Sequence, residues 1–362
     1  MSPIKSRLLL SAVLFLVYVP LASATVTYQV GICLGPAVTS FGTISAALAA
    51  TPAPDVVKVC PGPYPEQVVI TNPVTLEGIS VNGSDQALIV VPSGGLNTNT
   101  TFLVEPAAAQ IFVNNATGPV NITNIAVDGD GNGLSPGDYV IGVLYLNSSG
   151  KVDRLETRYQ TGTDRGIGVL LEGGSATPAV TIENSNMHDF DDYGIYAESF
   201  SGPLTAQVEG NTVIASHAEA GISVFESAPT VSHNFVSGPS SGLFGAGIVV
   251  AQNSGSISEN TITGSELGIL IYGGGVSVTS NKIYDISVDG IDLHSTSATV
   301  QGNTITQAHD GINFECFVDD NVSSNTISVI HSTGLINVPA AVVTSNTFYD
   351  VPAVSSVGSC AD

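Results

Sequence analysis

The stretch VQGNTITQAHDGINFE, Val300–Glu315, places an Asn after a Val-x-x triplet, then a Thr-Ile pair, then a Gly-Ile pair. The stretches Val278–His294 (VTSNKIYDISVDGIDLH) and Val322–Val338 (VSSNTISVIHSTGLINV) repeat this order. Eight Asn residues take the same place along the chain, 21–27 residues apart. They are Asn184, Asn211, Asn234, Asn260, Asn281, Asn303, Asn325 and Asn346. A repeat of this length is typical of a solenoid.

Each repeat holds three short segments: the triplet before the Asn, the Thr-Ile segment after it, and a Gly-Ile-x-apolar-x segment. Each segment alternates apolar and polar residues, is too short for a helix and is bounded by turn residues, which is typical of a β-strand. No such strand can bury its apolar side alone, so the repeats must stack to form a core. The sequence therefore predicts an all-β, single-domain right-handed parallel β-helix with three short strands per coil, over residues 25–362.

The repeated Asn and Gly have different expected roles. Asn tolerates the left-handed backbone conformation, so we expect it to turn the chain at a corner, where stacked side-chain amides can hydrogen-bond to one another. Gly is expected to supply unusual backbone angles where a loop enters the third strand. The second and fourth residues after each Gly are expected to face outward into solvent.

The first residues are typical of a secretory signal peptide. Lys5 and Arg7 precede the apolar run Leu8–Val19, and the small residues Ala22–Ala24 follow it. This order predicts a signal peptide over residues 1–24, cleaved after its last residue. The apolar run is short for a membrane span. We therefore expect a protein that is secreted, periplasmic or on the cell surface, with no membrane insertion after cleavage.

The charge of the chain narrows the choice of partners. After signal removal, 31 acidic residues stand against six Lys and Arg, a formal charge of −25. Such a charge repels nucleic acid and anionic membrane surfaces, so nucleic acid is not an expected partner. It also disfavours long polyanions such as pectate unless metal ions intervene.

Four cysteines suit an oxidising compartment, one pair lying near each end of the chain. We expect the disulfides Cys33–Cys60 and Cys316–Cys360, although four cysteines permit three connectivities. Between the first two, residues 43–50 (TISAALAA) have helical spacing and a high Ala content. We expect a helix there that caps the exposed end of the solenoid, within an N-terminal cap over about residues 25–60.

The stretch Ile44–Ile79 (ISAALAATPAPDVVKVCPGPYPEQVVITNPVTLEGI), followed by the V-x-x-N-T-I and G-I repeats, resembles the pectin-lyase-like superfamily. It is most similar to secreted bacterial proteins with right-handed β-helix repeats, over nearly the whole mature chain. The resemblance implies the fold, which hosts lyases, hydrolases, epimerases, esterases and non-enzymatic adhesins. It also implies that a substrate would lie along the sheet of Gly-Ile-x-apolar-x strands.

Polar side chains gather at the outward positions of two adjacent repeats. Asp292 and His294 fall beside Asn313 and Glu315, with Tyr272 one repeat earlier. Residues one coil apart in the same register lie about 5 Å apart at Cβ, so His294 can contact Glu315. We predict a catalytic acid–base group of Asp292, His294 and Glu315. The alternative is a solvated polar surface with a His–Glu contact.

Further residues approach the same place from neighbouring turns. We predict that Tyr272, Asn313, Asp310 and His309 contribute to ligand binding. The string DGIDLH, Asp289–His294, is similar to the YG-x-D-P-H signature of mannuronan C5-epimerases. That similarity would place Asp292 and His294 on the Asp and His of the signature, while Asp289 and Leu293 depart from its Tyr and Pro.

A possible cofactor is suggested by one acidic loop. Asp128, Asp130 and Asn132 match the first half of a calcium-binding loop, and Asp138 lies near the position of its distal acid. We therefore predict a calcium site formed by these four residues, with an ordinary acidic turn as the alternative. No other cofactor is expected.

Two functions follow from these observations. The first is a secreted protein that binds, or acts on, an extracellular polysaccharide or cell-surface glycan along the sheet of Gly-Ile-x-apolar-x strands. If it is an enzyme, it would be a polysaccharide hydrolase, lyase or epimerase. The alternative is a non-enzymatic structural or adhesive surface protein.

Overall fold

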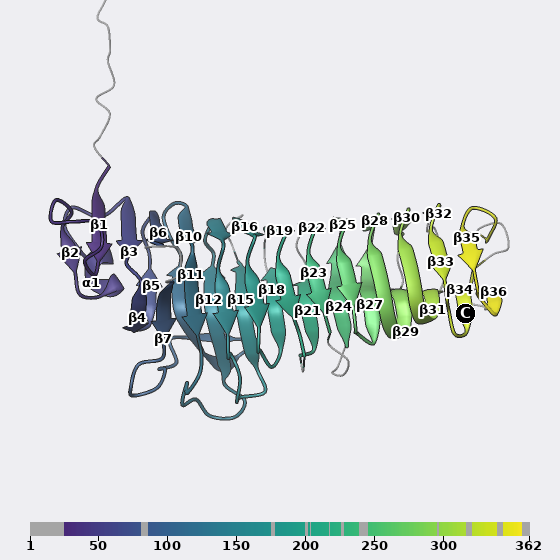
Figure 1. The fold of residues 1–362 in the computed structure, drawn as a ribbon, viewed down its shortest axis with the longest axis horizontal. Coiled ribbons are helices and arrows are strands. Elements are labelled where there is room, and N and C mark those ends of the chain that lie inside the picture. Colours follow the sequence, from purple (N-terminus) through teal and green to yellow (C-terminus); the bar gives the residue numbers. More distant parts are fainter. Residues whose placement is uncertain are drawn as a thin grey trace, which may run out of the picture.

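The computed structural model describes residues 25–80, 86–174, 178–199, 202, 204–216, 218–225, 228–238, 245–294, 297–315, 321–338 and 343–356. They form a rod of stacked strands that runs from the N-terminal to the C-terminal end of the chain (Figure 1). The expected signal peptide, residues 1–24, lies outside this part. Within it, no helix is both long and apolar enough to cross a membrane.

The first face of the rod is a sheet of 13 strands, which includes the triplets that precede the corner Asn. Neighbouring strands pair in parallel and in register, so that Val231, Ile257, Val278 and Val300 stack as one buried column. In spatial order its strands are β2 (Ser40–Phe41), β1 (Thr27–Val30), β3 (Val56–Val59), β6 (Val74–Gly78), β10 (Val120–Thr123), β13 (Gly150–Asp153), β16 (Ala179–Glu183), β19 (Thr205–Glu209), β22 (Ala228–Ser232), β25 (Ser256–Ser258), β28 (Ser277–Thr279), β30 (Thr299–Gln301) and β32 (Asn321–Ser323).

The second face is built from the strands that follow the corner. Its strands are β4 (Gly62–Pro65), β7 (Ala87–Val90), β11 (Ile125–Asp128), β14 (Glu156–Arg158), β17 (Asn186–His188), β20 (Thr212–Ile214), β23 (Phe235–Ser237), β26 (Thr261–Thr263), the first residues of β29 (Lys282–His294) and β31 (Thr304–Phe314), β33 (Thr326–Ser328) and β35 (Thr347–Tyr349).

The third face consists of the Gly-Ile-x-apolar-x strands. It holds β5 (Val68–Ile70), β9 (Glu105–Asn114), β12 (Tyr139–Leu146), β15 (Gly166–Gly173), β18 (Tyr193–Ser199), β21 (Ala220–Phe225), β24 (Ala246–Asn253), β27 (Leu267–Gly274), the last residues of β29 and β31, β34 (Thr333–Ile336) and β36 (Ala353–Ser355). Strand β8 (Thr100–Phe102) pairs with β9 in the antiparallel sense. Because β29 and β31 run through the corner, they join the second and third faces into one sheet of 23 strands. The predicted parallel β-helix with three strands per coil is therefore confirmed.

The corner Asn side chains form a row of hydrogen bonds inside the rod. From Asn211 to Asn325, each Nδ2 donates to the Oδ1 of the next Asn at 2.9–3.0 Å, and the backbone N–H of the same residue donates to that oxygen. Each Nδ2 also donates to a carbonyl of the preceding coil, as Asn303 does to Val278 at 2.9 Å. The buried amides therefore have their hydrogen bonds satisfied by neighbours above and below.

The expected left-handed conformation belongs to a different residue. The residue before the corner Asn has a positive φ in successive coils, as at His233 (57°), Glu259 (57°) and Ser280 (58°). Asn184 itself has a φ of 50°, and Ser185 takes the place in the row, where its N–H donates to Asn211 Oδ1 at 2.9 Å. The expectation that the corner Asn adopts this conformation therefore holds for Asn184 and is wrong for the seven Asn residues from Asn211 to Asn346.

The repeated Gly is required by packing rather than by its backbone angles. Gly268, Gly290 and their equivalents do not have a positive φ, so the expected reason for them is wrong. A Cβ on Gly268 would lie 2.6 Å from Cγ2 of Ile283, and one on Gly290 would lie 2.5 Å from Cγ2 of Ile305. The third strand thus passes so close to the second-face Ile of the next coil that no side chain fits.

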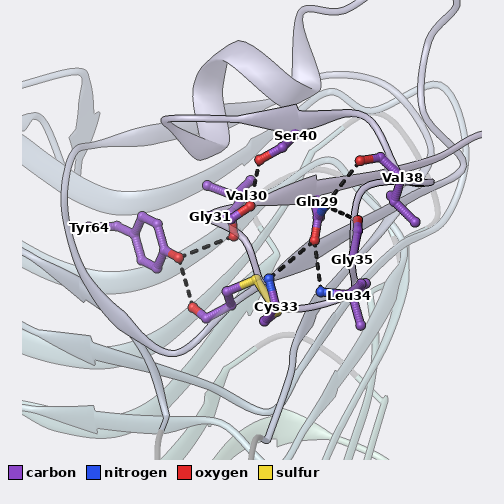
Figure 2. The surroundings of a disulfide bond; sticks show 10 residues. Gln29, Val30, Gly31, Cys33, Leu34, Gly35, Val38, Ser40 and Tyr64 are labelled. Atoms are coloured by element: carbon purple, nitrogen blue, oxygen red, sulfur yellow. Dashed lines mark hydrogen bonds between the residues drawn. A yellow bond between two sulfur atoms is a disulfide. The ribbon is translucent and has the colours of Figure 1, made fainter.

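The N-terminal end is held by the disulfide Cys33–Cys60, as expected. Around it, Gln29 fixes the loop that carries Cys33: its Oε1 accepts from Leu34 N at 3.0 Å, and its Nε2 donates to Val38 O at 3.0 Å (Figure 2). The hydroxyl of Tyr64 donates to Cys60 O at 2.8 Å. The second expected disulfide, between Cys316 and Cys360, lies outside the described residues.

One short helix, α1 (Ile44–Leu48), occupies part of the segment 43–50. Its first turn is held by Glu66, whose two carboxylate oxygens accept from Ile44 N at 2.7 Å and Ser45 N at 3.0 Å. Ile44 and Ala47 are buried in the main apolar core. A function of this helix as the cap of the solenoid remains a prediction.

Candidate functional site

The structure brings the predicted group around His294 together on the outer side of the third face. Strand β29 carries Asp292 and His294, and its neighbour β31 leads into Glu315. The Nε2 atom of His294 lies 2.9 Å from Asp292 Oδ2, and its Nδ1 atom lies 3.1 Å from Glu315 Oε2. Because carboxylates only accept hydrogen bonds, both contacts are hydrogen bonds when the imidazole is protonated.

The surroundings of His294 favour that protonated state. Burial alone would lower the pKa of the imidazolium. The hydrogen bonds and negative charges of Asp292 and Glu315 outweigh burial and raise the pKa of His294 above its ordinary value of 6.5. With both ring nitrogens engaged, His294 is better placed to orient two carboxylates than to accept a proton.

Asp292 is the most enclosed of the three side chains Asp292, His294 and Glu315. It is 7% exposed, and its second oxygen, Oδ1, is buried and has no hydrogen-bond partner in the described part of the chain. A buried acceptor without a donor is unfavourable unless a ligand or water supplies one. The Tyr272 ring lies beside it, 4.8 Å from the His294 ring between centroids and 36% exposed. The group thus combines an exposed aromatic ring with one carboxylate oxygen, Asp292 Oδ1, that has no donor among the described residues.

The turn residues predicted to bind ligand meet the group from one side. Asp289 pairs in register with Asp310, and Asp289 Oδ2 accepts from Asn313 Nδ2 at 3.3 Å. Asp310 bonds to His309 Nδ1 at 2.8 Å and accepts from Thr333 N at 2.7 Å. Burial, followed by the charge of Asp292, raises the pKa of Asp289 to about 6. We call Tyr272, Asp289, Asp292, His294, Asp310, Asn313 and Glu315 the His294 site.

The outward column that leads away from this site differs from expectation. Tyr196, Ser223, Val249 and Leu270 occupy the second position after their Gly, yet all four are buried. Tyr196, Val249 and Leu270 belong to a second apolar cluster on the outer side of the third face. The expectation that these positions face solvent is therefore wrong. Among Tyr196, Phe225 and Tyr272, which occupy the second or fourth position after their Gly, Tyr272 is the exposed residue. Tyr196 is buried and packs against Phe225.

A second group of titratable residues was not singled out from the sequence. The Tyr193 hydroxyl donates to Glu219 Oε2 at 2.9 Å, and the Tyr196 hydroxyl donates to Glu198 Oε2 at 3.0 Å. Burial, then the charge of Glu219, raises the pKa of Asp192 to about 8. The turns before these strands differ in length between repeats, so the repeat spacing in the sequence does not align Asp192 with Glu219. The strand register of the structure does, because Tyr193 pairs with Ala220. These side chains pack in or against the second apolar cluster, and we interpret the group as structural.

The predicted calcium ligands are engaged by their own loop. Asp128 bonds to Arg158 Nε at 2.9 Å through Oδ2 and accepts from Asp130 N at 3.0 Å through Oδ1. Asn132 is buried, and its Oδ1 accepts from Leu134 N at 3.0 Å. Oδ2 of the fourth predicted ligand, Asp138, accepts a backbone N–H at 3.2 Å. Calcium binding here remains a prediction, which a calcium titration of the melting temperature would test.

Among the residues that the structure describes, no group of three or more His, Cys, Asp or Glu side chains is arranged to hold a metal ion.

Comparison with known proteins supports the fold. The likeness shows the fold, a right-handed parallel β-helix. Residues 204–358 match a family described as periplasmic copper-binding protein (NosD). No curated protein matches the sequence.

Solved structures extend the likeness to most of the chain. A GH136 lacto-N-biosidase from Eubacterium ramulus is 12% identical, with a TM-score of 0.66 over 91% of this chain and 67% of that one. A double mutant of the periplasmic alginate epimerase AlgG is 16% identical, with a TM-score of 0.54 over 84% and 74% of the two chains. PfbA, a surface adhesin of Streptococcus pneumoniae, is 15% identical, with a TM-score of 0.50 over 86% and 88%. The family and the epimerase are both described as periplasmic, in agreement with the exported location expected from the sequence.

Proposed function

We propose that the protein binds an extracellular glycan at the His294 site on the outer side of the third face. The observation that carries the proposal is the placement of Asp292, whose enclosed Oδ1 has no donor in the described part of the chain while His294 holds its Oδ2 at 2.9 Å. Sugar hydroxyls are donors that suit such an acceptor. The exposed Tyr272 ring beside it offers an apolar surface on which a sugar ring can stack.

Binding is favoured over turnover by the state of the imidazole. A general base needs a ring nitrogen that is free to accept a proton, and both nitrogens of His294 face carboxylates. A reaction would require ligand binding to displace Asp292 or Glu315 from the ring. The names of the carbohydrate-active neighbours, a lacto-N-biosidase and an alginate epimerase, support a glycan as the ligand class.

The test is a panel of polysaccharides and oligosaccharides, assayed for binding and for product formation with and without calcium. His294→Gln is the informative variant, because the Gln amide donates only from its nitrogen, so its acceptor oxygen would face the second carboxylate. His233→Gln is the matched control, since His233 forms an exposed pair with Glu259 at 3.0 Å on another side of the rod. We expect loss of binding for the first variant only, with little change in melting temperature. Equal binding by both variants would remove the His294 site from consideration.

A second candidate function is a non-enzymatic structural or adhesive surface protein. It is favoured by the second apolar cluster, which includes Tyr196, Val249 and Leu270. These side chains are buried, so they are not accessible to a substrate on the face that an enzyme of this fold would use. The likeness to the adhesin PfbA is in keeping with it. Binding of the protein to intact cells that persists in the His294→Gln variant would favour this candidate.

A further inference from the structure

The His294 site is acidic, and cations are rare in the surrounding sequence. Lys282 is the single Lys or Arg between Arg165 and the end of the chain. It lies at the start of β29, on the second face, where it pairs in register with Thr261 and Thr304. The site itself holds four carboxyl groups, on Asp289, Asp292, Asp310 and Glu315, against the imidazolium of His294. A negatively charged ligand would therefore meet carboxylates, and the single Lys or Arg of residues 166–362, Lys282, lies on another face.

The hydrogen-bonding groups of the site point to the same ligand chemistry. Asp292 is 7% exposed, and its Oδ1 has no donor in the described part of the chain. Glu315 adds a more exposed carboxylate. The amide Nδ2 of Asn313 already donates to Asp289. The site thus offers acceptors, which pair with hydroxyl donors and repel the carboxylate of a uronic acid.

We infer that the His294 site selects an uncharged, hydroxyl-bearing glycan and rejects the uronic-acid polymer of the same stereochemistry. This inference rests on the proposed function, since it concerns the ligand of the same site. It separates this chain from a protein that acts on alginate, to which it is similar in fold alone. A hydroxymethyl group at C6 of the sugar can donate to Asp292 or Glu315, whereas a carboxylate at C6 cannot.

The experiment compares matched ligands that differ only at C6. Hexasaccharides of mannose, glucose and galactose are titrated against the corresponding hexamers of mannuronic, glucuronic and galacturonic acid, by calorimetry at low and at moderate ionic strength. We expect the neutral member of at least one pair to bind about tenfold or more tightly than its acidic partner. The ratio should shrink as salt screens the repulsion. The double variant Asp289→Asn, Glu315→Gln should narrow the ratio, whereas Glu209→Gln, an exposed acid on the first face, should leave it unchanged.

Each outcome decides between the two proposals. Tighter binding of a uronic-acid hexamer that is lost in His294→Gln would overturn the inference about charge and keep the site. A preference for neutral sugar that is unchanged by salt and by the double variant would also overturn it, because charge would then not be the cause. If no hexamer binds, or if His294→Gln binds as well as the unmodified protein, the proposed function fails and the inference fails with it.

Discussion

In strand β29 the Nε2 atom of His294 lies 2.9 Å from one carboxylate oxygen of Asp292, while the other oxygen of Asp292 is buried without a partner in the described part of the chain. The two residues are two positions apart, so both project from the same side of the strand. His294 therefore fixes the carboxylate of Asp292 through Oδ2 and leaves Oδ1 available to accept a hydrogen bond from a ligand. This arrangement gives the site both a fixed acceptor and a dependence on pH.

The affinity for a neutral glycan should fall as pH rises. The pKa of His294 is raised above 6.5 because hydrogen bonds and charges from Asp292 and Glu315 outweigh burial. The imidazolium is thus retained below pH 6.5 and lost as pH rises through the raised pKa, which leaves two carboxylates unpaired. Titrations of a neutral hexasaccharide from pH 6.5, where the carboxyl group of Asp289 with its pKa of about 6 is mostly ionised, to about pH 9 should show weaker binding at the alkaline end. An affinity that increases with pH would contradict this assignment.

Asn303→Ala should destabilise the fold by about 1–3 kcal/mol, because it leaves donors and acceptors of the corner row without partners. Asn303 accepts from Asn281 and donates to Asn325, each at 2.9–3.0 Å. The control is Asn121→Ala, since Asn121 makes a single 3.5 Å side-chain contact with Thr75 on the surface of the first face. Urea unfolding measures both variants. Equal stability of the two would show that the row contributes nothing.

Gly268→Ala should lower the free energy of unfolding by about 1–3 kcal/mol or more, since its new methyl group would overlap Ile283. The ideal Cβ lies 2.6 Å from Cγ2 of that residue and also meets the backbone of Gly290. Gly275→Ala is the matched control, because the nearest atom to its Cβ, Oγ of Ser297, is 3.5 Å away. Thermal unfolding should separate the two. A neutral effect of Gly268→Ala would mean that the strands can move apart at no cost.

Asp192→Asn should stabilise the protein at pH 8 and have a smaller effect at pH 4. Burial, then the charge of Glu219, raises the pKa of Asp192 from 3.8 to about 8 in the folded chain. The folded state therefore holds a proton that the unfolded state releases, so this residue contributes stability below pH 3.8 that is lost as pH rises through 8. The gain at pH 8 should exceed about 1 kcal/mol, since one unit of pKa shift corresponds to about 1.4 kcal/mol.

The control for that measurement is Glu209→Gln, an exposed change of the same charge on the first face. Melting temperatures of both variants should be recorded from pH 4 to about 9. Parallel pH profiles for Asp192→Asn and the unmodified protein would show that the carboxyl group of Asp192 is not shifted as described.

The fold was accessible from the sequence because the core positions repeat with the coil. The period assigns Val278 and Val300 to equivalent positions in adjacent coils, and these two residues pair in register in the structure. The reason for Gly268 was not accessible in the same way. A sequence shows that a side chain is missing, but not that Ile283 of the next coil fills the space. The corner of Asn184 shows a similar limit, since Ser185 takes its place in the row.

Part of the His294 site was predicted from the sequence, because the repeat register places equivalent residues of adjacent coils side by side. His294 and Glu315 occupy equivalent positions in adjacent repeats, so their contact followed from the register. The burial of Val249 and Leu270 did not follow, because the period identifies which side chains leave the core but not what covers them outside it. The pairing of Asn313 with Asp289 rather than Asp292 depends on side-chain rotamers, which repeat spacing does not fix.

The row of corner amides has a consequence for how such a chain can change length. Every junction offers the same donor on one side and the same acceptor on the other, from Asn211 to Asn346. Excision of residues 261–281 would join Asn260 to Lys282 and set its amide against Asn303, which restores the contact that was cut. A whole coil can thus be removed or added as a unit. The length of the rod then changes by whole coils, while the same Asn–Asn hydrogen bonds join the coils on either side.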